Sequence, residues 1–263
     1  MDTIQLIWLG IAQGLTEFLP ISSSAHLVLL SKLLGWPDQG LLIDVAAHAG
    51  SLLAVLVYFR VQLWQMMSAC IAPGVSKNSE ELRLVGHLFV ATLPIVIVAL
   101  FAADWIERYT RDPFIIAITT LVFALLLAYA ALSARELRDE YQLSLRAVIL
   151  IGCAQVLALI PGTSRAGITM TVALMLGQHR TAAARFSFLM SIPTIFGAVV
   201  FKARDLSTQA IAIDWPDLCL VIVVSALVAY LCIAVFLRLI TTIGLIPFVV
   251  YRLALGGALL VFL

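Results

Sequence analysis

Two short stretches of this sequence place polar side chains between apolar neighbours. Residues 13–26 contribute Gln13, Glu17, Ser22, Ser23 and His26, and residues 160–169 contribute Thr163, Ser164, Arg165 and Thr169. An ionisable side chain inside a membrane costs at least about 2.5–3.5 kcal/mol, so Glu17 and Arg165 each require an explanation. The simplest explanation is a buried Glu17–Arg165 ion pair that only fastens the two stretches together, but the surrounding residues are too specific for that alone.

The first stretch offers oxygen ligands for a metal ion. Gln13 and Glu17 are four residues apart, so on a helix they share one face. Their oxygen atoms suit Mg²⁺ or Ca²⁺ better than a softer metal. A satisfied polar pair at a helix–helix contact explains the same spacing equally well, and both interpretations stay open.

Serine and threonine follow a proline in both stretches, after Pro20 and after Pro161. Such residues are ordinary helix N-caps. A capped N-terminus in the middle of a membrane also presents free N–H groups and a positive dipole end, which favour bound phosphate. Arg165 would add a planar bidentate donor. We expect phosphate to contact Arg165 together with Ser22, Thr163, Ser164 and Thr169.

Three further residues are candidates for the same site. His26 lies three residues after Ser23, one turn along the second half-helix, which places an imidazole near a hydroxyl as a general acid or base requires. An isolated histidine in an apolar run is more often a core residue with a backbone partner. His48 and Arg252 could line the same cavity, although Arg252 could instead extend to the membrane surface.

The composition indicates which kind of protein positions these residues. Of 263 residues, 63% are hydrophobic and 12% are charged, whereas a soluble domain carries about a quarter charged residues. The formal net charge of +1 gives no indication of a nucleic-acid partner. We therefore expect an all-α integral membrane protein that forms a single membrane domain over residues 1–263.

Six apolar runs are long enough to cross a membrane as helices, namely 43–60, 86–103, 114–133, 183–202, 217–238 and 244–263. The regions 4–34 and 147–177 are apolar at both ends but interrupted by the polar stretches. Each half is about 14 residues, or about 20 Å of helix, which is too short for a hydrocarbon core about 30 Å thick. We predict two re-entrant helical hairpins, with their irregular backbone covered by protein or water.

The two hairpins resemble each other at an offset of 141 or 142 residues. In each, an Ala-Gln pair precedes a proline, a Ser/Thr cluster and a run that ends in Leu-Gly. Residues 1–134 and 146–263 then each hold one hairpin and three spans. Because three is odd, the second half begins on the opposite side of the membrane. This predicts an inverted-topology repeat whose hairpin tips meet near the midplane.

Lysine and arginine predict the orientation. The loops 60–86, 134–146 and 178–185, with the turn near Arg238, hold nine of these residues, whereas the loops 104–113 and 202–216 hold four. The first side is expected to be cytoplasmic. Both termini and the entry of the first hairpin then face outward.

Two motifs connect the sequence with a known family. Residues 13–26 read QGLTEFLPISSSAH, and residues 161–169 read PGTSRAGIT. In these motifs the chain resembles the undecaprenyl-diphosphatase family of bacteria, also called bacitracin-resistance proteins, whose motifs are [E/Q]xxxE followed by Pro-x-Ser-Ser and His, and PGxSRxxxT. The stretches 44–52, 186–193 and 246–252 extend the resemblance over almost the whole chain. Gln13, Ala25 and Ala166 depart from the commoner Glu, Gly and Ser.

The resemblance implies hydrolysis of undecaprenyl diphosphate to undecaprenyl phosphate and inorganic phosphate, with Mg²⁺ or Ca²⁺. This reaction recycles the lipid carrier for peptidoglycan synthesis at the bacterial plasma membrane, from a site that is expected to open to the periplasmic side. By resemblance, Glu17 and Gln13 would hold the metal, Ser23 would be the nucleophile with His26 as its proton-transfer partner, and Arg165, Ser164 and Thr169 would grip the diphosphate. Attack by a metal-bound water and assembly as a homodimer both stay open.

A transporter or lipid flippase is the main alternative, because inverted repeats with broken helices are a transporter architecture. A second lipid-phosphatase superfamily uses a histidine nucleophile and an Arg-Pro signature. The sequence contains no Arg-Pro dipeptide, which argues against that superfamily. A purely structural membrane protein would gain nothing from burying Glu17, His26 and Arg165.

Overall fold

The computed structural model describes residues 1–27, 35–36, 40–71, 79–110, 112–206 and 214–262. These residues form helices and no strand, apart from one isolated bridge between Arg138 and Gln178. Five of the described helices are long and apolar enough to cross a membrane, namely α3 (Gly40–Tyr58), α5 (Glu80–Thr110), α6 (Pro113–Ser133), α9 (Arg180–Leu206) and α10 (Trp215–Ile243). The predicted all-α, multi-pass membrane character is therefore confirmed.

The remaining span and two of the loops differ from the prediction. Helix α11 (Ile246–Phe262) occupies the predicted span 244–263, but its 17 residues give only about 26 Å of helix. The count of six spans therefore stays a prediction. The predicted loop 60–86 was partly wrong, since it contains α4 (Arg60–Ile71) and the first turns of α5, and α5 also continues through most of the predicted loop 104–113.

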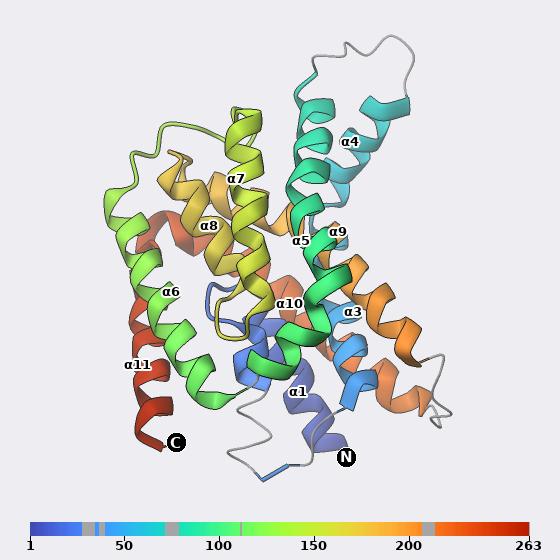
Figure 1. The fold of residues 1–263 in the computed structure, drawn as a ribbon. Coiled ribbons are helices and arrows are strands. Elements are labelled where there is room, and N and C mark those ends of the chain that lie inside the picture. The colour runs from blue at the N-terminus through green and yellow to red at the C-terminus, as the bar shows by residue number, and fades with distance from the viewer. Residues whose placement is uncertain (28–34, 37–39, 72–78, 111, 207–213, 263) are drawn as a thin grey trace.

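The helices that carry the polar stretches are short. They are α1 (Thr3–Thr16), α7 (Leu145–Gln155) with the 3₁₀ turn η1 (Val156–Leu159), and α8 (Arg165–Met175), and residues 23–27 are also helical. Figure 1 shows α1 and α7 approaching the middle of the molecule from opposite ends. In both segments the helix ends before the proline, Pro20 or Pro161, because proline has no backbone N–H to donate within a helix. The predicted return through residues 28–34 lies outside the described residues.

Small residues hold these short helices against long ones. A Cβ atom at Gly14 of α1 would lie 2.8 Å from the carbonyl oxygen of Ser225 in α10, and one at Gly152 of α7 would lie 2.5 Å from that of Ala91 in α5. Lipid supplies no hydrophobic drive between helices, so close backbone packing of this kind stabilises membrane bundles. The two helices leading to the polar stretches are thereby fixed.

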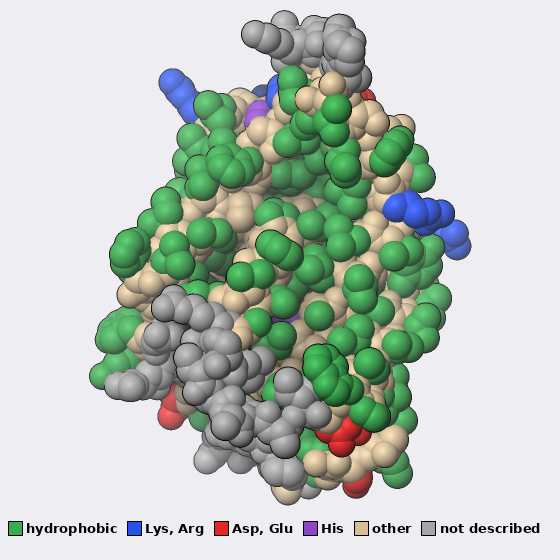
Figure 2. All heavy atoms as spheres, turned by 90° about the vertical axis from the view of Figure 1, so that its right-hand side faces the viewer, with side chains coloured by type: hydrophobic (Ala, Val, Ile, Leu, Met, Phe, Trp, Pro, Cys, Tyr) green, Lys and Arg blue, Asp and Glu red, His purple; other side chains and the backbone are tan. Residues whose placement is uncertain are grey.

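A series of aromatic contacts connects the first polar stretch with the core. The ring of Phe18, which is fully buried, lies 5.2 Å from that of Phe188, and Phe188 lies 5.7 Å from Phe236. Outside this core, large apolar side chains cover the middle of the face in Figure 2. Elsewhere in the described chain, Phe101 of α5 and Leu132 of α6 are 87% and 78% exposed. Such a surface suits contact with lipid.

Candidate active site

The backbone turns in the same unusual way at both interruptions. Ser22 and Ser164 have φ angles of 73° and 69°, in the left-handed region that non-glycine residues rarely adopt. Each stands directly before a helix, and they are 142 residues apart in the sequence. The Ser164 hydroxyl caps α8 by accepting a hydrogen bond from the Gly167 amide at 3.1 Å. We call residues 17–23 and 160–165 the first and second tips.

Glu17 is the centre of the polar contacts at the first tip. Its Oε2 atom accepts hydrogen bonds from the Ser23 hydroxyl at 2.7 Å and from Gln13 Nε2 at 3.0 Å. Its Oε1 atom lies 2.9 Å from a guanidinium nitrogen of Arg165. Only 7% of the Glu17 side chain and 11% of the Arg165 side chain are exposed. The two tips are thus joined by a buried ion pair that also contains a serine hydroxyl.

Arg165 is held on three sides. Besides Glu17, it donates to the carbonyl of Ser187 in α9 at 3.1 Å, and its guanidinium lies 5.8 Å from the centre of the Phe18 ring. The Thr169 hydroxyl lies 2.7 Å from that of Ser187. The planar guanidinium is therefore pre-oriented, and an incoming anion could replace the Glu17 carboxylate as its partner.

The predicted metal ligands also lie together. Gln13 is fully buried, its Nε2 atom is also 3.4 Å from the Ser51 hydroxyl, and its Oε1 atom has no partner among the described residues. His48 contributes from α3, with its Nε2 atom 3.9 Å from Glu17 Oε2 and its Nδ1 atom 2.7 Å from the Asp44 carbonyl. Gln13 and His48 therefore both lie beside the buried carboxylate of Glu17.

His26 and Ser23 have other hydrogen-bond partners in this arrangement, and the proton-transfer role expected of His26 stays a prediction. His26 Nδ1 lies 2.7 Å from the Ser22 carbonyl, and Nε2 lies 2.6 Å from the hydroxyl of Tyr251 in α11. Ser23 instead donates to Glu17. A spacing of three residues places both side chains on one side of a helix, but it does not determine which neighbour each one meets.

Arg252 does not extend to the membrane surface. It is 0% exposed and donates to the Pro20 carbonyl of the first tip at 3.3 Å. It also donates to the Gly162 and Thr163 carbonyls of the second tip at 2.8 and 3.0 Å. Gly167 makes room for it, since a Cβ atom there would lie 2.8 Å from the Arg252 guanidinium. Arg252 thus fixes the two tips relative to each other.

The other predicted phosphate contacts lie at the tips. The Ser22 hydroxyl lies 3.2 Å from that of Ser24, and the buried Thr163 hydroxyl has no partner in the part of the chain that the structure describes. Thr119 of α6 supports the second tip by donating to the Pro161 carbonyl at 2.7 Å. Thr163 therefore retains an unused hydroxyl beside the amides of the second tip.

Sequence reasoning missed Ser51, Ser187, Tyr251 and Thr119. The first three fall inside the stretches 44–52, 186–193 and 246–252 that match the family, and each interrupts an apolar run. Thr119 is half of a Thr-Thr pair within the otherwise apolar α6. A polar residue in a spanning helix was the available signal, but only the fold shows which tip it faces.

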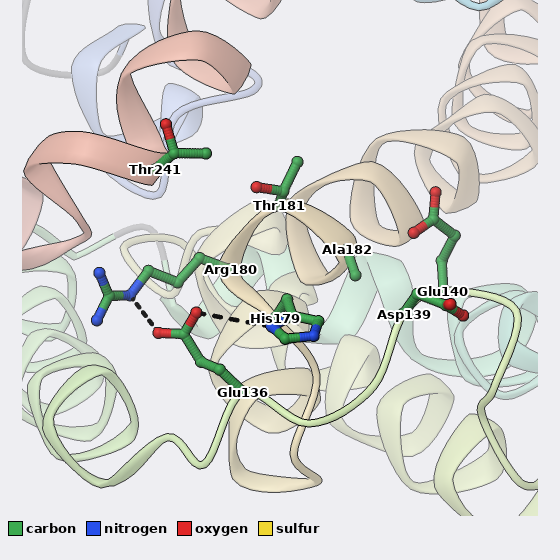
Figure 3. A pocket seen from close by; sticks show the side chains of 8 residues that line it. All are labelled: Glu136, Asp139, Glu140, His179, Arg180, Thr181, Ala182 and Thr241. Carbon is green, nitrogen blue, oxygen red and sulfur yellow. Dashed lines mark ion pairs between the residues drawn. The ribbon is translucent and has the colours of Figure 1, made fainter.

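A separate polar pocket of about 420 Å³ lies away from the tips (Figure 3). It is bounded by Glu136, Asp139, Glu140, the first residues of α9 and Thr241. Arg180 and Glu136 form an ion pair there at 2.8 Å, with about a third of each side chain exposed. None of the predicted site residues lines this pocket, so the chemistry of the tips is separate from it.

A family model described as bacitracin resistance protein BacA matches residues 6–258. The match includes both tips, the metal-ligand candidates and the α11 residues that reach them. By this match over nearly its whole length, the chain belongs to the bacitracin-resistance protein family.

Proposed function

We propose that this protein hydrolyses undecaprenyl diphosphate to undecaprenyl phosphate and inorganic phosphate. The observation that carries the proposal is the Ser23 hydroxyl 2.7 Å from a buried carboxylate that is itself paired with Arg165. A hydroxyl bonded to a proton acceptor and placed beside a fixed guanidinium is the arrangement that phosphoryl transfer to serine requires. Family membership supports the same reaction.

The residues suggest a two-step reaction. Ser23 Oγ forms a bond to the terminal phosphorus, Glu17 accepts the hydroxyl proton, and the bond from that phosphorus to the bridging oxygen breaks, releasing the lipid monophosphate. Water then attacks the phosphoserine, which returns the serine and releases inorganic phosphate. Arg165 turns from Glu17 to the phosphoryl oxygens, and the helix N-termini at the tips add their amides. Freeing Glu17 from Arg165 makes the carboxylate a stronger base.

We propose that Gln13 and Glu17 hold the divalent cation. The buried, unpartnered Oε1 atom of Gln13 fits such a ligand, and Mg²⁺ commonly uses one or two carboxylates completed by substrate phosphates. Within the described ranges no group of three or more His, Cys, Asp or Glu side chains could hold a metal by itself. A bound cation would neutralise charge on the diphosphate, and the protein ligands would be incomplete without substrate.

We also propose that six spans and two re-entrant hairpins form an inverted repeat. In such a repeat α10 corresponds to α5, and their contacts match: α10 packs on α1 and α3 of the first half, and α5 packs on α7 and α9 of the second. The equivalent helices α3 and α9 pack on each other, as do α6 and α11. The matching φ angles of Ser22 and Ser164 support this correspondence. With such a repeat, the distribution of Lys and Arg favours a substrate opening on the periplasmic side of the bacterial plasma membrane.

Purified protein in detergent tests the reaction directly. We expect phosphate release from a C55 isoprenyl diphosphate that EDTA abolishes and that added Mg²⁺ or Ca²⁺ restores. Well-folded protein that releases no phosphate with either metal would exclude the phosphatase. The same preparation in vesicles, with a labelled isoprenyl phosphate on one side, would then test the flippase.

A further inference from the structure

The hydrogen bonds of His26 determine where its protons lie. The Ser22 carbonyl, 2.7 Å from Nδ1, can only accept a hydrogen bond, so Nδ1 must carry hydrogen. In the neutral ring, Nε2 is then the acceptor, and the Tyr251 hydroxyl at 2.6 Å is its donor. The two rings lie within 8° of parallel with their centres 5.7 Å apart. Both ring nitrogens are therefore occupied.

Tyr251 is itself held in place through its neighbour in the chain. Arg252 donates to carbonyls of both tips and is completely buried. This anchors the middle of α11 against the tips. Tyr251, one residue earlier, is 43% exposed, and its hydroxyl contacts His26. The contacts of Arg252 with the tips therefore also fix the position of the Tyr251 phenol.

We propose that Tyr251 is a positioning residue that fixes the ring plane of His26 by donating to Nε2, while the Ser22 carbonyl sets the tautomer. This inference rests on the proposed phosphatase for its functional meaning, but not for its geometry. The Tyr251 hydroxyl keeps the lone pair of His26 Nε2 occupied, so His26 does not take the proton of Ser23. His26 and Tyr251 instead form one hydrogen-bonded unit from the Ser22 carbonyl to the edge of the site.

The tautomer can be measured without any enzymatic assay. The sequence contains four histidines, so protein labelled with ¹⁵N-histidine gives few signals, and His26→Gln assigns those of His26. We expect the Nδ1–H tautomer in both proteins, because the Ser22 carbonyl sets it, and a shifted Nε2 signal in Tyr251→Phe, which has lost the hydrogen bond to that atom. Tyr230→Phe is the matched control, because Tyr230 of α10 contacts Tyr58 and should leave the His26 signals unchanged. An Nε2–H tautomer in the wild type, or unchanged His26 signals in Tyr251→Phe, would overturn the proposal.

Kinetics separate this role from a general loss of structure. Tyr251→Phe should lower kcat by about tenfold, the equivalent of one hydrogen bond, and change KM by no more than about twofold. Unchanged kcat in folded Tyr251→Phe would refute the functional part of the proposal. If the wild type releases no phosphate, the phosphatase fails, whereas the His26 signals of Tyr251→Phe still decide the role of Tyr251 in positioning His26.

Discussion

Replacing Glu17 with Gln should destabilise the fold through the ion pair that joins the two tips. The change keeps the size of the side chain but leaves Arg165 without its counter-charge, where its side chain is only 11% exposed. Removing one partner of a buried pair costs about 3–5 kcal/mol, because the other charge stays buried and unpaired. We expect Glu17→Gln and Arg165→Gln each to lower the free energy of unfolding by about 3 kcal/mol, at the lower end of that range.

A double-mutant cycle distinguishes this ion pair from two independent effects. Denaturant titrations in detergent, followed by tryptophan fluorescence, would give unfolding free energies for the wild type, both single variants and the double variant. The double variant should lose at least about 1 kcal/mol less than the sum of the single losses, as coupled neighbours do. Additive losses would refute the reasoning.

The ion pair between Glu136 and Arg180 is the matched control. Its atoms are 2.8 Å apart, but about a third of each side chain is exposed. Solvent screens such a pair, so Glu136→Gln should cost less than about 1 kcal/mol. A cost equal to that of Glu17→Gln would show that burial does not set the strength of the pair at the tips.

Two further predictions concern the second tip. Gly162 and Gly177 have similar φ angles of 90° and 86°, but a Cβ atom at Gly162 would meet Thr119 and lie 2.6 Å from the Ile116 carbonyl, whereas one at Gly177 meets nothing within 4 Å. In thermal melts, Gly177→Ala should lower the free energy of unfolding by only about 1–2 kcal/mol, the cost of the left-handed backbone, and Gly162→Ala should lower it by more. Equal losses of stability would contradict the crowding at Gly162. Arg252→Lys should lower the rate of phosphate release at least about tenfold, because one ammonium group cannot reach three carbonyls in two tips. The rate is compared in protein that still elutes as a single folded species. A wild-type rate would show that Arg252 does not hold the tips.

Local rules allowed much of the scaffold to be predicted. Apolar length predicted the five long helices, and Pro20 and Pro161 predicted both interruptions, because proline cannot donate within a helix. The cost of burying charge pointed to Glu17 and Arg165 as neighbours, and the ion pair between them is present. Each of these predictions depends on residues close together in the sequence, or on two opposite charges that are costly to bury unless they are paired.

The partners within the site could not be predicted in the same way. Ser23 was expected to face His26, but the packing of the first tip directs it to Glu17 and leaves His26 with Tyr251, 225 residues away in the sequence. Arg252 was open between surface and site, and only the approach of α11 to both tips decides it. Such contacts depend on tertiary packing, for which spacing along one helix carries no information.

The most direct test of the central claim compares two neighbouring serines. The Ser23 hydroxyl donates to Glu17, whereas Ser24 is exposed and its hydroxyl lies 3.2 Å from that of Ser22. Initial rates of phosphate release from a C55 isoprenyl diphosphate would be measured for Ser23→Ala and Ser24→Ala, purified and checked for folding together. We predict that Ser23→Ala loses activity by a factor on the order of 10³ or more, while Ser24→Ala stays within about twofold of the wild type, since it touches neither Glu17 nor Arg165. A Ser23→Ala protein that retains the wild-type rate would contradict the assignment of Ser23 as the nucleophile.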